Sequence, residues 1–171
     1  MQLARATEIL PSGAWPADTF ADRIALTYDD RHRRRMRYTT ARGISFLLDL
    51  ARAAVLRAGD ALRLTDGRLI LIDAAPEALL EVTAPDSRTL TRLAWHIGNR
   101  HLPARLEADR ILIREDAVIE AMLRGLGASV HSLHAPFTPE PGAYDVHLGV
   151  RGSAHADSHS HDHESAPMEE P

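Results

Sequence analysis

The spacing of apolar residues changes once along this chain, at residues 73–76. Before that point, in residues 24–72, apolar residues form short groups separated by glycine and charged residues, a pattern typical of strands. Beyond it the spacing shifts from a period of about two towards about 3.6 residues, the repeat of an α-helix. The change predicts an α+β protein, with an all-β domain in residues 1–74 followed by a mixed domain in residues 75–148.

The second domain alternates strand-like and helix-like segments in the order β-α-β-β-α-β. It begins with a strand-like segment, and Asp86 or Ser87 then offers a side-chain cap for a helix. We expect Gly98 and Asn99 to end that helix, because both residues tolerate a left-handed backbone. A charged hairpin, a second helix capped by Asp116 and a last strand complete the order, which is that of the ferredoxin-like arrangement.

The chain contains no cysteine, which excludes thiolate metal sites, iron–sulfur ligation, disulfides and cysteine nucleophiles. Histidine and carboxylate side chains remain as metal ligands. With 20 Lys and Arg residues against 24 Asp and Glu residues, the formal net charge of -4 gives no general attraction to nucleic acid or to an anionic membrane. The sequence has neither a signal-peptide core nor a run of about 20 apolar residues that could span a membrane. We therefore expect a cytoplasmic protein without nucleic-acid or membrane partners.

Four of the ten histidines lie close together, at His155, His159, His161 and His163. They fall in residues 149–171, which have too few large apolar residues to offset the entropy of ordering, so we expect a disordered tail. A flexible chain can place two or more imidazoles around one ion, and such a site prefers copper and nickel over iron or manganese. These residues alone do not rank nickel against zinc or copper. A passive solvated extension or a cloning remnant is less favoured, because acidic residues are interspersed among the histidines.

The segment from Trp95 to Pro103 contains two further histidines, His96 and His101. By the helical period His96 lies off the apolar stripe of the first helix, whereas His101 follows the helix in an extended link. A single loop histidine more often bonds to backbone than to metal. If the domain dimerises about a twofold axis near His101, however, symmetry supplies a second imidazole, and tail residues can extend the site. His101 is therefore the favoured ligand in the folded part, with His96 and His147 as weaker candidates.

This segment is similar to the signature of the urease accessory protein UreE family, chiefly through its core Gly98-Asn-Arg-His101. The histidine-rich C-terminus is also frequent in that family, and the resemblance extends to residues 26–28, 31–37, 117–126 and 136–144. It implies a peptide-binding-like N-terminal β domain, a ferredoxin-like metal-binding and dimerisation domain, and a metal-binding tail. It also implies a homodimer that binds Ni²⁺ through His101 at its interface, with Zn²⁺ or Cu²⁺ as competitors.

The resemblance implies a metallochaperone, not an enzyme, which passes nickel to an accessory GTPase and the urease apoprotein. The alternative is a histidine-rich nickel or zinc buffer without a dedicated client enzyme. A hydrolytic metalloenzyme ranks last, because it needs three fixed ligands and an open position, and the folded part offers no convincing third ligand. Some relatives carry a His-x-His pair where the second helix opens, but here the stretch is Arg114-Glu-Asp-Ala117, so that internal site is not expected.

Positive charge is concentrated in the run Arg31-His-Arg-Arg-Arg-Met-Arg37, which follows the strand expected at residues 24–28. We expect this run to form a hairpin with a solvated polar face, or to contact a partner protein, rather than to bind nucleic acid.

Three remaining side chains have structural interpretations. His131 and His134 lie three apart in the last strand, so they should point to opposite faces of the sheet and not share a metal. Trp95 is expected in a core or at an interface.

Overall fold

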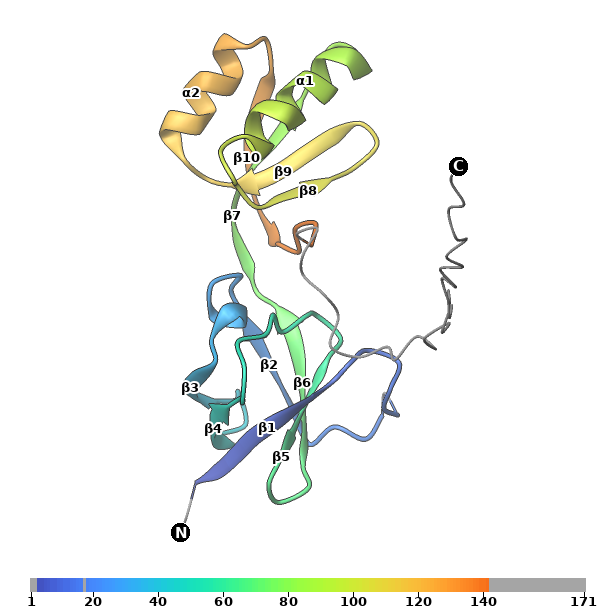
Figure 1. Cartoon of the computed structure of the whole chain (residues 1–171), viewed down its shortest axis with the longest axis vertical. Helices are drawn as coiled ribbons and strands as arrows, with labels where there is room; N and C mark the ends of the chain where they lie inside the picture. Colours follow the sequence, from blue (N-terminus) through green and yellow to red (C-terminus); the bar gives the residue numbers. More distant parts are fainter. Residues whose placement is uncertain (1–2, 17, 142–171) are drawn as a thin grey trace, which may run out of the picture.

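The computed structural model describes residues 3–16 and 18–141, and within them the chain forms two β-sheets and two α-helices (Figure 1). The first sheet has six strands, and the second has four strands, which the helices cover. This confirms the predicted α+β class. No helix in the described part of the chain is long and apolar enough to cross a membrane.

The first sheet is mixed, because its central strand β1 is parallel to one neighbour and antiparallel to the other. Its strands are β1 (Ala4–Leu10), β2 (Asp22–Leu26), β3 (Arg35–Thr39), β4 (Ser45–Asp49), β5 (Ala61–Leu64) and β6 (Leu69–Ala74). They lie in the order β2-β6-β5-β1-β4-β3, with β1 parallel to β4 and antiparallel to β5. Buried side chains such as Phe46, Ile70 and Ile72 form its core. A turn at Asp66 and Gly67 joins β5 to β6, and Gly67 has a φ of 87°.

The basic run after β2 does not fold back to form a hairpin with that strand. It begins with the short 3-10 helix η1 (Asp30–His32) and then enters β3, which pairs with β4. Because β2 pairs with β6, strands β2 and β3 lie at opposite edges of the sheet. The expectation of a solvated face is wrong for Arg31, which is 1% exposed, although residues 33–37 are exposed. The reason is that Arg31 finds a backbone partner in the second domain.

The second domain has the predicted order β-α-β-β-α-β. Its elements are β7 (Pro76–Thr83), α1 (Ser87–Gly98), β8 (Ala104–Leu106), β9 (Arg110–Arg114), α2 (Ala117–Gly125) and β10 (Ser129–Pro136). The strands lie in the order β10-β7-β9-β8, and every neighbouring pair is antiparallel. Both helices are capped as predicted, because Asp86 accepts a hydrogen bond from the backbone of Thr89, and Asp116 accepts them from Val118 and Ile119.

One face of this second sheet packs against the apolar stripes of the two helices. Leu93 and Ile97 of α1 and Leu123 of α2 share a buried cluster with Leu80 and Val82 of β7. Burying such a stripe supplies most of the stability of a short helix. The cluster therefore fixes where α1 ends on the surface of the domain.

A single residue, Ala75, separates β6 from β7, so one extended segment passes from the first sheet into the second (Figure 1). Polar contacts cross between the domains beside it. The Glu77 carboxylate accepts a hydrogen bond from the Tyr28 N–H at 2.6 Å, and Arg114 forms an ion pair with Asp29 at 2.8 Å. The two domains are therefore joined by side-chain contacts as well as by the chain.

Arg31 lies buried at this junction. Its guanidinium donates a hydrogen bond to the backbone carbonyl of Phe137, a residue that is itself fully buried. Burial lowers the pKa of the Arg31 guanidinium, and the nearby Glu77 carboxylate opposes that shift. The Tyr28 ring packs edge-on against Phe137, with 5.6 Å between ring centroids, and its centroid lies 5.8 Å from the guanidinium carbon. A buried cation and two aromatic rings thus fill the space between the domains.

We predict that Arg31→Ala lowers the free energy of unfolding by about 1–3 kcal/mol, because it leaves the buried Phe137 carbonyl without its donor. Urea denaturation followed by circular dichroism measures the change. Arg33→Ala removes an exposed guanidinium from the same run and is the matched control, with an expected change below about 0.5 kcal/mol. Equal stabilities of the two variants would show that the buried contact does not hold the junction.

Candidate metal centre

His101 lies in the turn that connects the end of α1 to β8. Its backbone N–H donates to the carbonyl of Gly98 at 2.9 Å, and the N–H of Leu102 donates to the carbonyl of Ile97 at 3.5 Å. These two bonds form the pattern of a Schellman motif, in which the residue that reverses the chain has a left-handed backbone. His101 has a φ of 54°, and in the described part of the chain no other non-glycine residue has a positive φ.

Helix α1 ends where predicted, at Gly98 with Asn99 as its C-cap, but the predicted left-handed backbone at these residues is wrong. Gly98 is still helical and Asn99 has a φ of -61°, so neither residue adopts the left-handed backbone expected of it. His101 itself makes the reversal and does not lie in an extended link. The cause is apolar packing: Leu102 packs against the cluster that contains Ile97, and the chain must turn just before it to bring it there.

The contacts of the neighbouring residues hold this strained turn in place. A left-handed backbone costs a residue with a Cβ about 1 kcal/mol relative to glycine, and it persists only where its surroundings enforce it. Leu102 packs on one side of the turn, while the Arg100 guanidinium donates to the carbonyl of His96 at 2.9 Å. The side chain of His101 is exposed. The turn therefore gives a fixed backbone to an exposed imidazole, an arrangement suited to a surface metal ligand.

The surface around the turn presents an aromatic ring and an open glycine. Trp95 is 61% exposed, so it is not a core residue. Of the two locations predicted for it, a core or an interface, only an interface remains. Its ring centroid lies 5.0 Å from that of His96, a half-buried residue off the apolar stripe, as predicted. A Cβ added at Gly98 would meet no atom within 4 Å. Exposed aromatic side chains are enriched on surfaces that contact another chain.

Within residues 3–16 and 18–141, no group of three or more histidine, aspartate or glutamate side chains could hold a metal ion. A single imidazole does not bind a metal tightly, so a site at His101 needs ligands from a second copy of the chain or from beyond these residues.

The chain after β10 returns to this turn. Glu140 donates its backbone N–H to the carbonyl of Ala104 at 2.8 Å. Ala104 is only three positions after His101, so Glu140 lies close to the turn. The described part of the chain ends at Pro141. The remaining predicted ligands lie outside the described residues: His147, His155, His159, His161 and His163.

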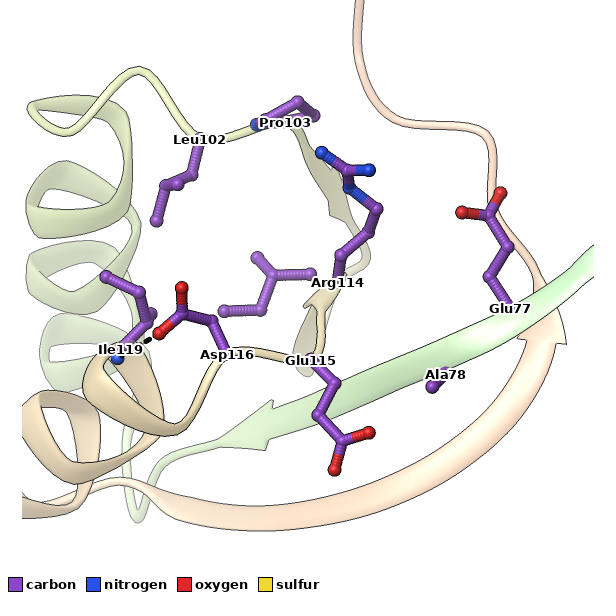
Figure 2. A pocket seen from close by; sticks show the side chains of 9 residues that line it. Glu77, Ala78, Leu102, Pro103, Arg114, Glu115, Asp116 and Ile119 are labelled. Carbon is purple, nitrogen blue, oxygen red and sulfur yellow. Dashed lines mark hydrogen bonds between the residues drawn. The ribbon is translucent and has the colours of Figure 1, made fainter. Parts of the chain in front are cut away.

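A pocket beside the start of α2 collects three carboxylates without forming a cation site (Figure 2). Glu77, Glu115 and Asp116 line it together with the apolar side chains of Leu102 and Ile119. Asp116 is engaged in capping α2, and Glu77 accepts a backbone hydrogen bond from the first domain. The carboxylates of Glu115 and Asp116 point in opposite directions in Figure 2. The stretch that lacks a His-x-His pair therefore also lacks convergent carboxylates.

The two histidines of β10 lie as predicted. His131 pairs with Glu81 and His134 with Ala78 along an uninterrupted ladder, so their side chains point to opposite faces of the sheet. Both residues are exposed.

Two residues that shape the turn were missed in the sequence, Arg100 and Leu102. The signal for Leu102 was present: an apolar residue five positions after a buried helical residue has the spacing of the hydrophobic contact in a Schellman motif. Ile97 and Leu102 have this spacing, which places the left-handed residue at His101.

Comparisons with known proteins cover most of the chain. Family models of the N-terminal and C-terminal domains of the UreE urease accessory protein match residues 6–75 and 77–164. The urease accessory protein UreE of Bradyrhizobium sp. strain BTAi1 is 54% identical over 142 residues, which are 83% of this chain and 68% of that protein. The protein of that name from Azorhizobium caulinodans is 50% identical over 161 residues, which are 94% of this chain and 76% of that protein. The protein of that name from Ruegeria pomeroyi is 51% identical over 156 residues, which are 91% of this chain and 100% of that protein. This chain therefore belongs to the family of UreE urease accessory proteins.

Proposed function

We propose that this chain is a nickel metallochaperone that captures Ni²⁺ and delivers it for assembly of the urease metallocentre. A urease accessory protein is not itself the enzyme, and its family name specifies a client. Membership therefore supports a dedicated chaperone over the nickel or zinc buffer considered above. The observation that carries the metal site is the left-handed backbone of His101, which holds an exposed imidazole at a place where glycine would cost less.

We propose that two copies of the chain meet at the end of α1 and share one nickel ion between their His101 residues. Trp95 offers an exposed ring for such a contact. Gly98 supports this contact between copies. A glycine destabilises a helix by about 1 kcal/mol relative to alanine. Packing within the described part of the domain does not require glycine here, because an added Cβ would meet no atom within 4 Å. A twofold axis near this point would duplicate the imidazole and make a two-histidine site.

We propose that histidines beyond Pro141 complete the coordination of the ion. From Glu140, which lies beside Ala104, a chain reaches about 24 Å over the seven residues to His147. Its own length thus allows His147 to approach His101, and the histidines at 155, 159, 161 and 163 add further imidazoles. Such a site is open and exchangeable, which suits transfer, and Zn²⁺ or Cu²⁺ would compete for it. His96, half-buried beside Trp95, remains a weaker candidate.

The remaining parts of the proposal concern organisation and partners. We assign residues 1–74 to a peptide-binding-like β domain, residues 75–148 to a ferredoxin-like metal-binding and dimerisation domain, and residues 149–171 to a disordered metal-binding tail. The partners are an accessory GTPase and the urease apoprotein, in the cytoplasm, without nucleic acid or membrane.

His101→Ala and His101→Gly should both abolish the tightest nickel site, but they should differ in stability. We expect the glycine variant to be about 1 kcal/mol more stable than the alanine variant, because glycine accepts the left-handed backbone. Calorimetric titration measures the nickel site, and urea denaturation measures the stability. His134→Ala removes an exposed histidine from β10 and is the matched control for nickel binding. If His101→Ala keeps the tightest site, the assignment is wrong.

Trp95→Glu should convert a dimer to a monomer, because it places a charge in the proposed contact without disturbing the core. Light scattering after gel filtration measures the mass. Val118→Glu is the matched control, since Val118 is 76% exposed on the other helix. A dimer that survives Trp95→Glu but not Val118→Glu would place the interface on α2 instead.

Replacing the histidines at 155, 159, 161 and 163 with serine in the full-length chain should reduce the number of nickel ions bound per chain and keep the tightest site. A chain ending at Gly149 should behave in the same way, because both changes leave His101 and His147 in place. Equilibrium dialysis gives the stoichiometry. An unchanged stoichiometry in both proteins would exclude the tail as a metal collector.

A further inference from the structure

Strand β3 forms one edge of the first sheet and carries most of the exposed part of the basic run (Figure 1). Arg35 and Arg37 share one face of the strand, because side chains alternate along it and Tyr38 of the opposite face is buried. Arg33 precedes them in extended backbone and is also exposed. On the opposite face Met36 is 38% exposed, so the edge presents guanidinium groups on one side and an apolar side chain on the other.

The outer backbone groups of β3 are available for pairing. Thr40 donates its N–H to Ile44, and Leu50 donates its N–H to the carbonyl of Arg34. Even-numbered residues of β3 therefore bond to β4, and the N–H and carbonyl groups of Arg35 and of residues 37 and 39 point away from it. No other strand of the described chain pairs with β3. Among residues 3–16 and 18–141, this edge therefore has a row of donors and acceptors that no other strand pairs with.

The charge at this edge is only partly balanced. Arg5 of β1 and Arg35 both pair with the carboxylate of Asp49. Arg33 and Arg37 have no ion pair among the described residues. The face therefore carries an excess of positive charge, although the whole chain is acidic.

Exposed charges on an edge strand often serve to prevent pairing with other strands. Here the charges have one sign, so they repel a second copy of the same edge, in which guanidinium groups would face guanidinium groups, and attract a carboxylate-bearing strand. We propose that the β3 edge is a docking site for an extended acidic segment of a partner polypeptide, which adds to the sheet as a further strand. Its acidic side chains would lie beside Arg35 and Arg37, and its alternate apolar side chains beside Met36. This proposal does not depend on the nickel site.

Fluorescence anisotropy with a labelled peptide of alternating glutamate and valine tests the proposal on the full-length protein. We expect this peptide to bind, and we expect the matching peptide of alternating lysine and valine not to bind. Affinity should fall as salt is added, because the contacting charges lie near solvent. Failure of the acidic peptide to bind, or equal binding of both peptides, would overturn the proposal.

Two variants separate charge from strand addition. The double variant Arg35→Ser with Arg37→Ser should bind the acidic peptide at least about tenfold more weakly. Thr39→Pro keeps every guanidinium but removes an outward N–H, and a proline is tolerated on an edge strand, so it too should weaken binding by about tenfold. Circular dichroism confirms that both variants fold.

The control is the double variant Arg88→Ser with Arg105→Ser, which removes two exposed guanidinium groups from the second domain. It should bind the peptide as the original chain does. If the control loses as much affinity as the β3 double variant, the attraction is general and the docking site is wrong. If Thr39→Pro binds the acidic peptide as tightly as the original chain does, the peptide does not add to the sheet as a strand, and strand addition at β3 is wrong.

Discussion

The packing of Leu102 against the apolar face of α1 determines where the chain reverses, and the position of the His101 imidazole depends on that reversal. The helix buries Leu93 and Ile97, and Leu102 joins the same cluster from the far side of the turn. Only a left-handed residue between them closes the turn. A histidine in that position makes the fold less stable than a glycine would. The turn therefore holds an imidazole at the surface at the expense of local stability.

Much of the second domain could be predicted from the sequence, because its signals are local. Asp86 and Asp116 cap their helices as expected, and the period of the apolar residues gave the order β-α-β-β-α-β. The general place of His101 was also predictable, since it follows the helix directly. Its left-handed backbone was not, because glycine and asparagine nearby offered more usual places to reverse the chain.

The first domain was harder to predict because its pairings are distant in sequence. Strand β1 lies parallel to β4 and beside β5, and no local pattern selects these partners. The neighbour of β2 is β6 and not the basic run that follows it. Arg31 is buried only because a carbonyl of residue 137 meets it, and a single sequence does not indicate such a contact between domains.

The short connection between β6 and β7 affects how a bound nickel ion and a partner polypeptide meet. With one residue between the strands, and Arg31, Glu77 and Arg114 bridging the domains, the two halves are not tethered by a flexible linker. A polypeptide bound to the first domain would be held at a restricted separation from the end of α1. Under such a restriction, encounter is set by an effective local concentration and not by the bulk concentration of either partner. Ion transfer between the two would then be an intramolecular event within the complex.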